Sequence, residues 1–211
     1  MKKVLSLSLM LLISIMSIAQ TEVAKVESDA ANPKVEIEKP VGLKVGDVAP
    51  QITGTDQDGK TVNLQEILKT KEVVIVFYRG QWCPYCNKEL SKITEELATI
   101  NAKGATVIAI TPETAENIKK TIEKTKATFG IVEDKGLEIM KSYKVSFAVD
   151  DETITKYKKY GIDFGKANGA NGANLPVPAT YIIGKDGKIK YTFFNPDYSK
   201  RASVEDIIKN L

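Results

Sequence analysis

The sequence predicts an α/β fold in which helices flank a central β-sheet. An uninterrupted apolar run at positions 73–78 is typical of a strand that is buried on both faces of a sheet. Strands and helices alternate along the chain from about residue 45, which favours a layered α/β architecture. After the apolar run, apolar residues recur at the spacing of a helix with one buried face, at Leu90, Ile93, Leu97 and Ile100.

The remaining elements follow from turn residues and apolar spacing. Two short strands at 51–53 and 61–63 flank an Asp58-Gly59 turn and predict a β-hairpin. The Asn- and Gly-rich stretch 167–174 predicts a loop. Elsewhere we expect helices at 84–102, from Thr111-Pro112-Glu113 to about 125, at 136–142 and at 204–211, strands at 105–110 and 128–132, an extended segment at 145–148, and a second hairpin of strands 179–183 and 188–193.

Residues 1–19 predict a cleaved secretory signal. Lys2 and Lys3 precede an uncharged stretch rich in Leu, Ile and Met, and small residues follow at Ser17 and Ala19. A retained membrane anchor is the alternative, but the apolar stretch is shorter than the ~20 residues that a spanning helix needs. We therefore expect an exported protein without stable membrane insertion, periplasmic or secreted if its source is bacterial.

The residues after the signal predict a leader and one domain. Residues 20–44 are polar and contain Asn32-Pro33 and Lys39-Pro40, so we expect a flexible leader that precedes a domain at 45–211. Loss of the two lysines of the signal lowers the formal charge from +3 to +1. Because acidic and basic residues are interspersed, nothing in the charge pattern indicates a nucleic-acid partner.

Cys83 and Cys86 are the only cysteines of the chain, which has no histidine. A structural zinc site or a cysteine-ligated iron–sulfur cluster needs about four ligands, and attachment of a c-type haem needs a histidine where Asn87 stands. We therefore expect no metal and no cofactor. A structural disulfide or a redox pair remains, and the redox pair is favoured because a disulfide across so small a loop adds little stability.

The helix that follows the motif predicts different roles for the two thiols. Cys86 lies four residues before Leu90 and shares its buried stripe, whereas Glu89 should face water. Cys83 precedes Pro84, a residue suited to the first helical position, so its sulfur should face the positive end of the helix, which lowers the pKa of a thiol. We expect Cys83, the more exposed and more acidic thiol, to attack, and Cys86 to resolve.

Neighbours of the thiols are candidates for active-site support. Arg79 could stabilise the Cys83 thiolate by its charge, although a solvated or salt-bridged surface arginine is an equally good interpretation. Trp82 and Pro84 flank Cys83 directly and complete the predicted site on this side.

Three motifs resemble a known family. The stretches FYRGQWCPYC at 77–86, GDVAP at 46–50 and LPVPATY at 175–181 are similar to the redoxin group of the thioredoxin superfamily, in particular to the peroxiredoxin-like AhpC/TSA proteins. The resemblance covers residues 43–211. It implies a thioredoxin-like fold, with a central mixed β-sheet flanked by helices and an N-terminal β-hairpin extension. It also implies that the Val177–Pro178 peptide is cis and lies against the sulfurs, whereas the residues alone suggest an ordinary trans proline.

The same resemblance leaves two reactions open. Peroxiredoxins place a reactive Cys three residues after Thr or Ser and seven after Pro, and here those positions hold Cys86, Cys83 and Arg79. We therefore expect an exported thiol–disulfide oxidoreductase that acts on protein disulfides and needs an external thiol or reductase. A thiol-dependent peroxidase, an antioxidant that reduces hydroperoxides, is the alternative, and a non-catalytic binding module is disfavoured by the intact Cys pair.

The loop expected at about 165–175 is a candidate for partner selection. It contains two Asn-Gly pairs, which favour mobility, and it leads into Pro178. A solvated connector without a role in recognition is the alternative.

Overall fold

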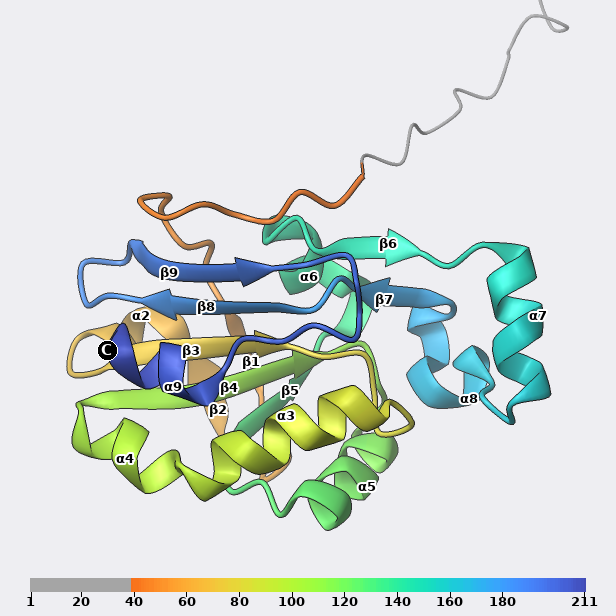
Figure 1. Ribbon diagram of the computed structural model, residues 1–211, viewed down its shortest axis with the longest axis horizontal. Helices are drawn as coiled ribbons and strands as arrows, with labels where there is room; N and C mark the ends of the chain where they lie inside the picture. The colour runs from red at the N-terminus through yellow and green to blue at the C-terminus, as the bar shows by residue number, and fades with distance from the viewer. Residues whose placement is uncertain (1–38) are drawn as a thin grey trace, which may run out of the picture. The chain divides into compact units, whose positions relative to one another are not determined.

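A computed structural model describes residues 39–211 of the chain. The expected signal at 1–19 and the leader up to residue 38 lie outside the described residues. A mixed five-stranded sheet forms the centre of the domain, with β3, β4 and β5 parallel and β8 antiparallel to its neighbours β3 and β9 (Figure 1). The strands, in their order across the sheet, are β5 (Gly130–Glu133), β4 (Ala105–Thr111), β3 (Glu72–Phe77), β8 (Ala179–Ile183) and β9 (Ile189–Phe194).

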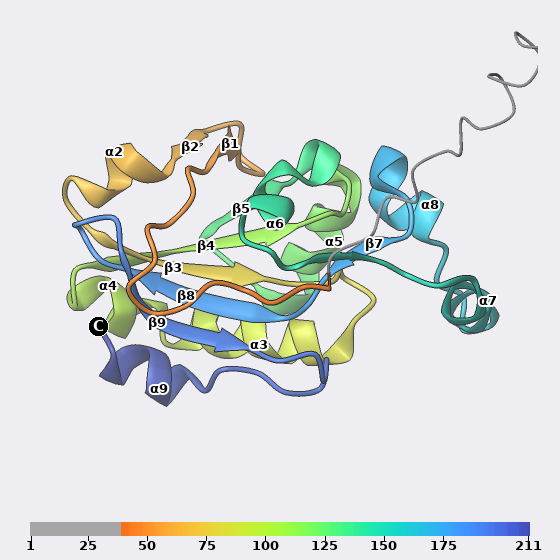
Figure 2. The same ribbon diagram turned by 90° about the horizontal axis from the view of Figure 1, so that it is seen from above.

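Both faces of β3 are buried, as its apolar run predicts. Val73, Ile75 and Phe77 point to one side of the sheet, while Val74 and Val76 point to the other, because side chains alternate along a strand. The first side is covered by α2 (Leu64–Leu68) and α6 (Glu138–Ser142), and the second by α3 (Pro84–Glu95), α4 (Leu97–Ala102), α5 (Ala115–Thr125) and α9 (Val204–Lys209). Figure 2 shows α2 and the helices α3 and α9 on opposite sides of the sheet.

Most elements occur where the sequence predicts them, with shifted ends. The N-terminal hairpin is formed by β1 (Thr53–Thr55) and β2 (Thr61–Asn63). The single helix expected at 84–102 is instead two, because the backbone of Glu96 leaves the helical region (φ −98°, ψ 8°) between α3 and α4. The end of the expected leader lies against the domain, since the N–H groups of Gly42 and Leu43 donate to Lys144 O and Tyr181 Oη.

A small subdomain lies between β5 and β8, and the sequence predicts only its helix at 136–142, found at 138–142, and its extended segment at 145–148, found as a strand at 146–148. It contains η1 (Lys135–Leu137), β6 (Ser146–Ala148), α7 (Asp151–Lys159), α8 (Phe164–Asn168), η2 (Gly169–Asn171) and β7 (Asn174–Pro176), and α7 and α8 extend to one end of the molecule (Figure 1). No residue of α7 is fully buried, and its apolar face consists only of the half-buried Ile154 and Tyr157, which is a weak helical signal in the sequence. Its start is fixed by Asp150, whose side chain accepts the N–H of Thr153.

The prediction of a loop at 167–174 is wrong for most of its length. Asn168 and Asn171 are buried, 2% and 8% exposed. Asn171 Nδ2 donates to the carbonyls of Pro112 and Asp134, and Asn168 Nδ2 donates to those of Gly172 and Asn174. These asparagines tie the segment to the domain, because their amides satisfy backbone carbonyls that would otherwise be buried without partners. Within residues 39–211, no helix is long and apolar enough to cross a membrane.

Candidate active site

Cys83 lies in the turn between β3 and α3, at the N-cap of the helix. Its backbone is extended (φ −90°, ψ 110°), and its Sγ accepts the N–H of Cys86 at 3.3 Å. Pro84 follows in the first turn of the helix and is exposed to solvent. Its missing N–H costs no hydrogen bond, because an N–H at this position has no partner within the helix. The sequence of the turn thus directs one sulfur at the free amides of the helix start.

The two thiols differ in acidity. A hydrogen bond with the Cys86 side chain is the largest cause that lowers the pKa of Cys83, to about 6, and the Cys86 amide, Arg79 and Arg201 lower it further against the effect of burial. Burial, and then the neighbouring Cys83, raise the pKa of Cys86. Both thiols are free, and Cys83 is the one that ionises first.

The expected exposure of Cys83 is not found. Cys83 is 1% exposed and Cys86 is completely buried. The cover is Arg201, whose Nη2 lies 3.2 Å from Cys86 Sγ and 3.9 Å from Cys83 Sγ. Because Cys83 is 1% exposed, a substrate reaches its sulfur only when neighbouring side chains move.

Glu89, on α3, forms an ion pair with Arg201. Its Oε2 lies 2.7 Å from Arg201 Nε, and the two side chains are 3% and 11% exposed. The prediction that Glu89 faces water is wrong, because a position three residues after Cys86 turns the carboxyl toward the sheet, where Thr180 Oγ1 lies 3.5 Å from Oε1. Burial raises the pKa of Glu89 to about 8, although Arg201 opposes the shift.

A second buried carboxyl, Glu113, holds the loop before Cys83. Its Oε1 accepts the N–H of Gln81 at 2.8 Å, and burial raises its pKa to about 7. Gly80 has φ +153°, and a Cβ there would lie 2.6 Å from Trp82 Nε1 and 2.7 Å from Glu113 Oε1. Glycine is therefore required at this position of the loop.

Arg79 is not a surface arginine. It is 4% exposed, and its guanidinium lies over the rings of Trp82, Tyr157 and Tyr198 at 4.9, 5.4 and 4.5 Å from their centroids. Its Nη2 donates to the hydroxyl of Tyr157. Trp82 is half-buried and also packs edge-on against Tyr157.

The implied cis peptide is absent, since every peptide bond in residues 39–211 is trans. The chain runs from β7 into β8 without reversing, and trans is the intrinsically preferred isomer even before proline. The N–H of Val177 donates to Val145 O at 2.8 Å, so it is not free to pair with a bound chain. Val177 and Pro178 do border the same cavity as Arg79.

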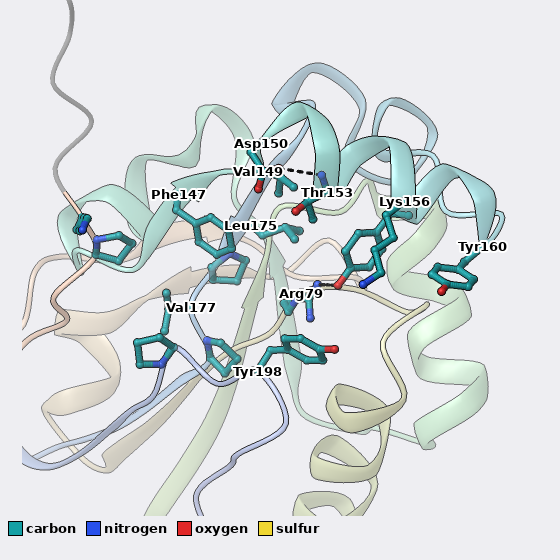
Figure 3. A pocket seen from close by; sticks show the side chains of 16 residues that line it. Arg79, Phe147, Val149, Asp150, Thr153, Lys156, Tyr160, Leu175, Val177 and Tyr198 are labelled. Atoms are coloured by element: carbon teal, nitrogen blue, oxygen red, sulfur yellow. Dashed lines mark hydrogen bonds between the residues drawn. The ribbon is translucent and has the colours of Figure 1, made fainter.

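That cavity has a volume of about 680 Å³ and opens beside the thiol turn (Figure 3). It is lined from α7, β7 and the segment after β9, which includes Tyr198. In the described part of the chain, no group of three or more His, Cys, Asp or Glu side chains is placed to hold a metal ion. The site residues offer the chemistry of an acidic thiol, a buried partner thiol and the charges around them.

Sequence reasoning missed Arg201, Glu113 and Tyr157. Arg201 stands 115 residues after Cys86, in a segment without a recognisable motif. Glu113 is predicted only as part of the start of a helix, whereas the helix α5 begins after its cap residue Thr114. Glu89, which the sequence predicts on the exposed face of the helix, did have a usable signal: it lies three residues after Cys86 on the same helix.

The fold and the thiol pair together define a thioredoxin-like redox protein. Two solved structures support the fold. Peroxidoxin BcpB from Mycobacterium tuberculosis superposes with a TM-score of 0.61 at 17% identity, over 80% of this chain and 96% of that one. The thioredoxin domain of a thiol-disulfide oxidoreductase from Bacteroides vulgatus gives 0.51 at 24% identity, over 74% and 94%. The expected thioredoxin-like fold with an N-terminal hairpin is thus confirmed.

The chain belongs to the AhpC/TSA family, whose sequence model matches residues 45–192. Among curated proteins it is similar to the thiol-disulfide oxidoreductase ResA of Bacillus thuringiensis subsp. konkukian, with 28% identity over 70% of this chain and 68% of the relative. It is also similar to the chloroplastic peroxiredoxin Q of Triticum aestivum, with 29% identity over 79% and 67%. The protein is therefore an oxidoreductase enzyme that works on thiols, disulfides or peroxides.

Proposed function

We propose that the protein is a thiol–disulfide oxidoreductase in which Cys83 attacks and Cys86 resolves. One observation carries this choice: the acidic thiol is Cys83 at the start of α3, and the position at which peroxiredoxins react belongs to Cys86, whose pKa is raised by burial. A nucleophile must be a thiolate near neutral pH, and only Cys83 meets that condition.

In the first step, the Cys83 thiolate attacks one sulfur of a substrate disulfide. A bond forms between Cys83 Sγ and that sulfur, the substrate disulfide breaks, and the other substrate sulfur leaves as a thiolate. The hydrogen bonds that stabilise the Cys83 thiolate, from Cys86 above all, also make it a good leaving group in the reverse direction.

In the second step, Cys86 must lose its proton inside the protein. Its thiolate would lie 3.2 Å from Arg201 Nη2, and Arg201 also contacts Glu89. Because burial keeps Glu89 protonated near neutral pH, the proton of Cys86 passes instead to the substrate thiolate released in the first step, and the charge of Arg201 stabilises the sulfur that remains. Cys86 then attacks Cys83 Sγ and releases the reduced substrate, and an external thiol or reductase restores the Cys83–Cys86 pair.

The test compares two reactions of the purified mature protein. Reduction of insulin disulfides with a dithiol as electron source should proceed, and thiol-dependent consumption of hydrogen peroxide should be slower by at least about tenfold. Fast peroxide consumption without disulfide reduction would overturn the assignment.

A thiol-dependent peroxidase is the second candidate, favoured by the similarity to peroxiredoxin Q and by the contact of Arg201 with Cys86, the position of the reactive peroxiredoxin Cys. In that reaction a thiolate attacks the hydroperoxide, takes one oxygen as a sulfenic acid and releases an alcohol or water. The second Cys then forms the disulfide and releases water. Trapping a sulfenic acid with dimedone in the Cys83→Ser variant, but not in Cys86→Ser, would support this candidate.

We further propose export, with residues 1–19 removed as a signal and 20–44 as a leader, of which 39–44 lie against the redox domain of 45–211. The support is the charged start, the apolar stretch and the small residues at Ser17 and Ala19. In a bacterial host, the mass and N-terminal sequence of protein from the periplasm should show a start at Gln20. A start at Met1 in the membrane fraction would show that the segment is kept as an anchor.

A further inference from the structure

Arg79 is a buried cation without a carboxylate partner. No ion pair in residues 39–211 includes it, and its Nε–H donates to no acceptor in that part of the chain. The Tyr157 hydroxyl and three aromatic rings compensate it only in part. A buried charge is normally paired, because removal of its water without a partner is costly.

The guanidinium borders the cavity beside the thiol turn. Figure 3 shows Arg79 near Tyr198, with Phe147, Val149 and Leu175 also lining the cavity. The walls are therefore mainly apolar, and the cavity volume of about 680 Å³ lies within the range that holds ligands of a few hundred daltons, such as a tri- or tetrapeptide.

The charges around the cavity favour an anion. Lys39 and Lys156 line it together with Arg79, against one carboxylate, Asp150. Asp150 is already engaged, since its side chain accepts the N–H of Thr153 at 2.8 Å. An occupant with one carboxylate and an apolar part would match both the charge and the walls.

The cavity also lies beside the turn that carries the reactive thiol, so a substrate bound in it would be held near Cys83. The bond from Cys86 contributes most to the low pKa of Cys83, but the charge of Arg79 contributes as well. Arg79 stands four residues before Cys83 in the same turn between β3 and α3, so an anion held by Arg79 lies beside the turn that carries the attacking sulfur. Val177 and Pro178, which run into β8, form another part of the same wall.

We propose that Arg79 and this cavity recognise an acidic peptide segment of the disulfide substrate, with a Glu or Asp carboxylate on the guanidinium and a neighbouring apolar side chain between Tyr157 and Leu175. The inference rests on the proposed function, because it assigns the substrate class of the same site. It makes Arg79 a specificity residue for polypeptides with an acidic residue close to the cysteine.

Binding can be measured without the reaction. The Cys83→Ser, Cys86→Ser double variant of the full chain has no thiol, and serine also caps helices. Trp82 is the only tryptophan and lies 4.9 Å from the Arg79 guanidinium, so its fluorescence reports an anion there. The probes are the peptides acetyl-Ser-Glu-Leu-Phe-amide and acetyl-Ser-Gln-Leu-Phe-amide.

We expect the Glu peptide to bind at least about tenfold more tightly than the Gln peptide, the ratio for one charge-assisted hydrogen bond in a desolvated site. Arg79→Met should remove this preference. Lys119→Met, which removes a charge from the exposed face of α5, should leave it intact. Because the comparison of the two peptides needs no change at Arg79, it stays decisive if Arg79→Met does not fold.

Catalysis gives an independent readout. With wild-type protein, a Cys-Glu-Leu-Phe peptide activated as its 2-pyridyl disulfide should show a lower KM than the Gln peptide at similar kcat. Uncharged 2-hydroxyethyl disulfide should be reduced equally by wild type and Lys119→Met. If even this small disulfide is not reduced, the proposed function fails. If it is reduced but the two peptides bind equally, only the present inference fails.

Two other occupants would also overturn the proposal. Tight binding of a fatty acid such as oleate, without binding of either peptide, would show a lipid site. The chain itself carries Val35-Glu36-Ile37-Glu38 directly before Lys39, a lining residue. A change of Trp82 fluorescence in Glu36→Gln, Glu38→Gln without any peptide would show that the chain fills its own cavity.

Discussion

The β3–α3 turn and the segment between β9 and α9 meet at the same two sulfurs, but the sequence specifies them differently. Within the turn, Gly80, Cys83 and Pro84 each have a local reason for their position. Arg201 reaches Cys86 across 115 residues and has no such local reason. The turn therefore determines which atoms react and which thiol ionises first, and the remote segment places a positive charge beside the two sulfurs.

The largest effect should come from the turn itself. Cys83→Ser should lower disulfide reduction by about a thousandfold or more, because the only acidic thiol is lost. Cys86→Ser should instead accumulate mixed disulfides, since attack proceeds and resolution does not. Non-reducing electrophoresis with a protein substrate measures both. Equal trapping by the two variants would mean that the thiols share their roles.

Gly80→Ala should be the next largest effect, on stability. A Cβ would lie 2.6 Å from Trp82 Nε1 at φ +153°, so clash and backbone strain together should cost on the order of 2–4 kcal/mol. Urea denaturation measures the loss.

Gly59→Ala is the matched control for this variant. Gly59 also has a positive φ, +78°, but nothing lies within 4 Å of its Cβ position. The control should therefore lose only about 1 kcal/mol, the cost of strain alone. If both variants lose the same amount, the close packing of Glu113 and Trp82 on Gly80 is not what fixes the turn.

The same contrast explains what the sequence could predict. The sheet, the hairpin and the helix start at Pro84 depend on apolar periodicity and turn residues, which are local signals, and they appear where expected. α7 has no buried residue, and the buried asparagines 168 and 171 look like loop residues in any sequence. Their positions depend on tertiary contacts that no local pattern encodes.

The candidate site divides along the same line. The direction of the Cys83 pKa shift could be predicted from its place before Pro84, although the largest cause is a hydrogen bond with the Cys86 side chain. The burial of Cys83 beside Arg201 could not be predicted, and neither could the packing of Arg79 against three aromatic rings. Each depends on segments that are distant in the chain. The family resemblance, which supplied the expected cis peptide, was wrong at that single bond.

Glu89 lies where the two regions join, and the pH dependence of the free energy of unfolding tests its role there. Its pKa is raised from 4.5 to about 8, so the folded state holds a proton that the unfolded chain has released. Stability should therefore fall as pH rises from about 5 to about 8.5, by on the order of 4 kcal/mol. Glu89→Gln should flatten this slope in urea denaturation. Glu95→Gln, exposed on the same helix, should not change it, and an unchanged slope in Glu89→Gln would mean that Glu89 is ionised when buried.

Arg201 tests the remote region alone and should give the smallest effect. In Arg201→Met, the emerging Cys86 thiolate loses a charge-assisted hydrogen bond at 3.2 Å, so resolution of a mixed disulfide should slow by about tenfold. The attack step should change less, because Arg201 is the last of the causes that lower the pKa of Cys83. Rapid-quench measurement of the mixed disulfide separates the two steps. Arg201→Lys should restore part of the rate through its charge, and Lys200→Met, exposed beside it, should leave both steps unchanged. A variant in which attack slows and resolution does not would show that Arg201 serves Cys83 and only covers Cys86.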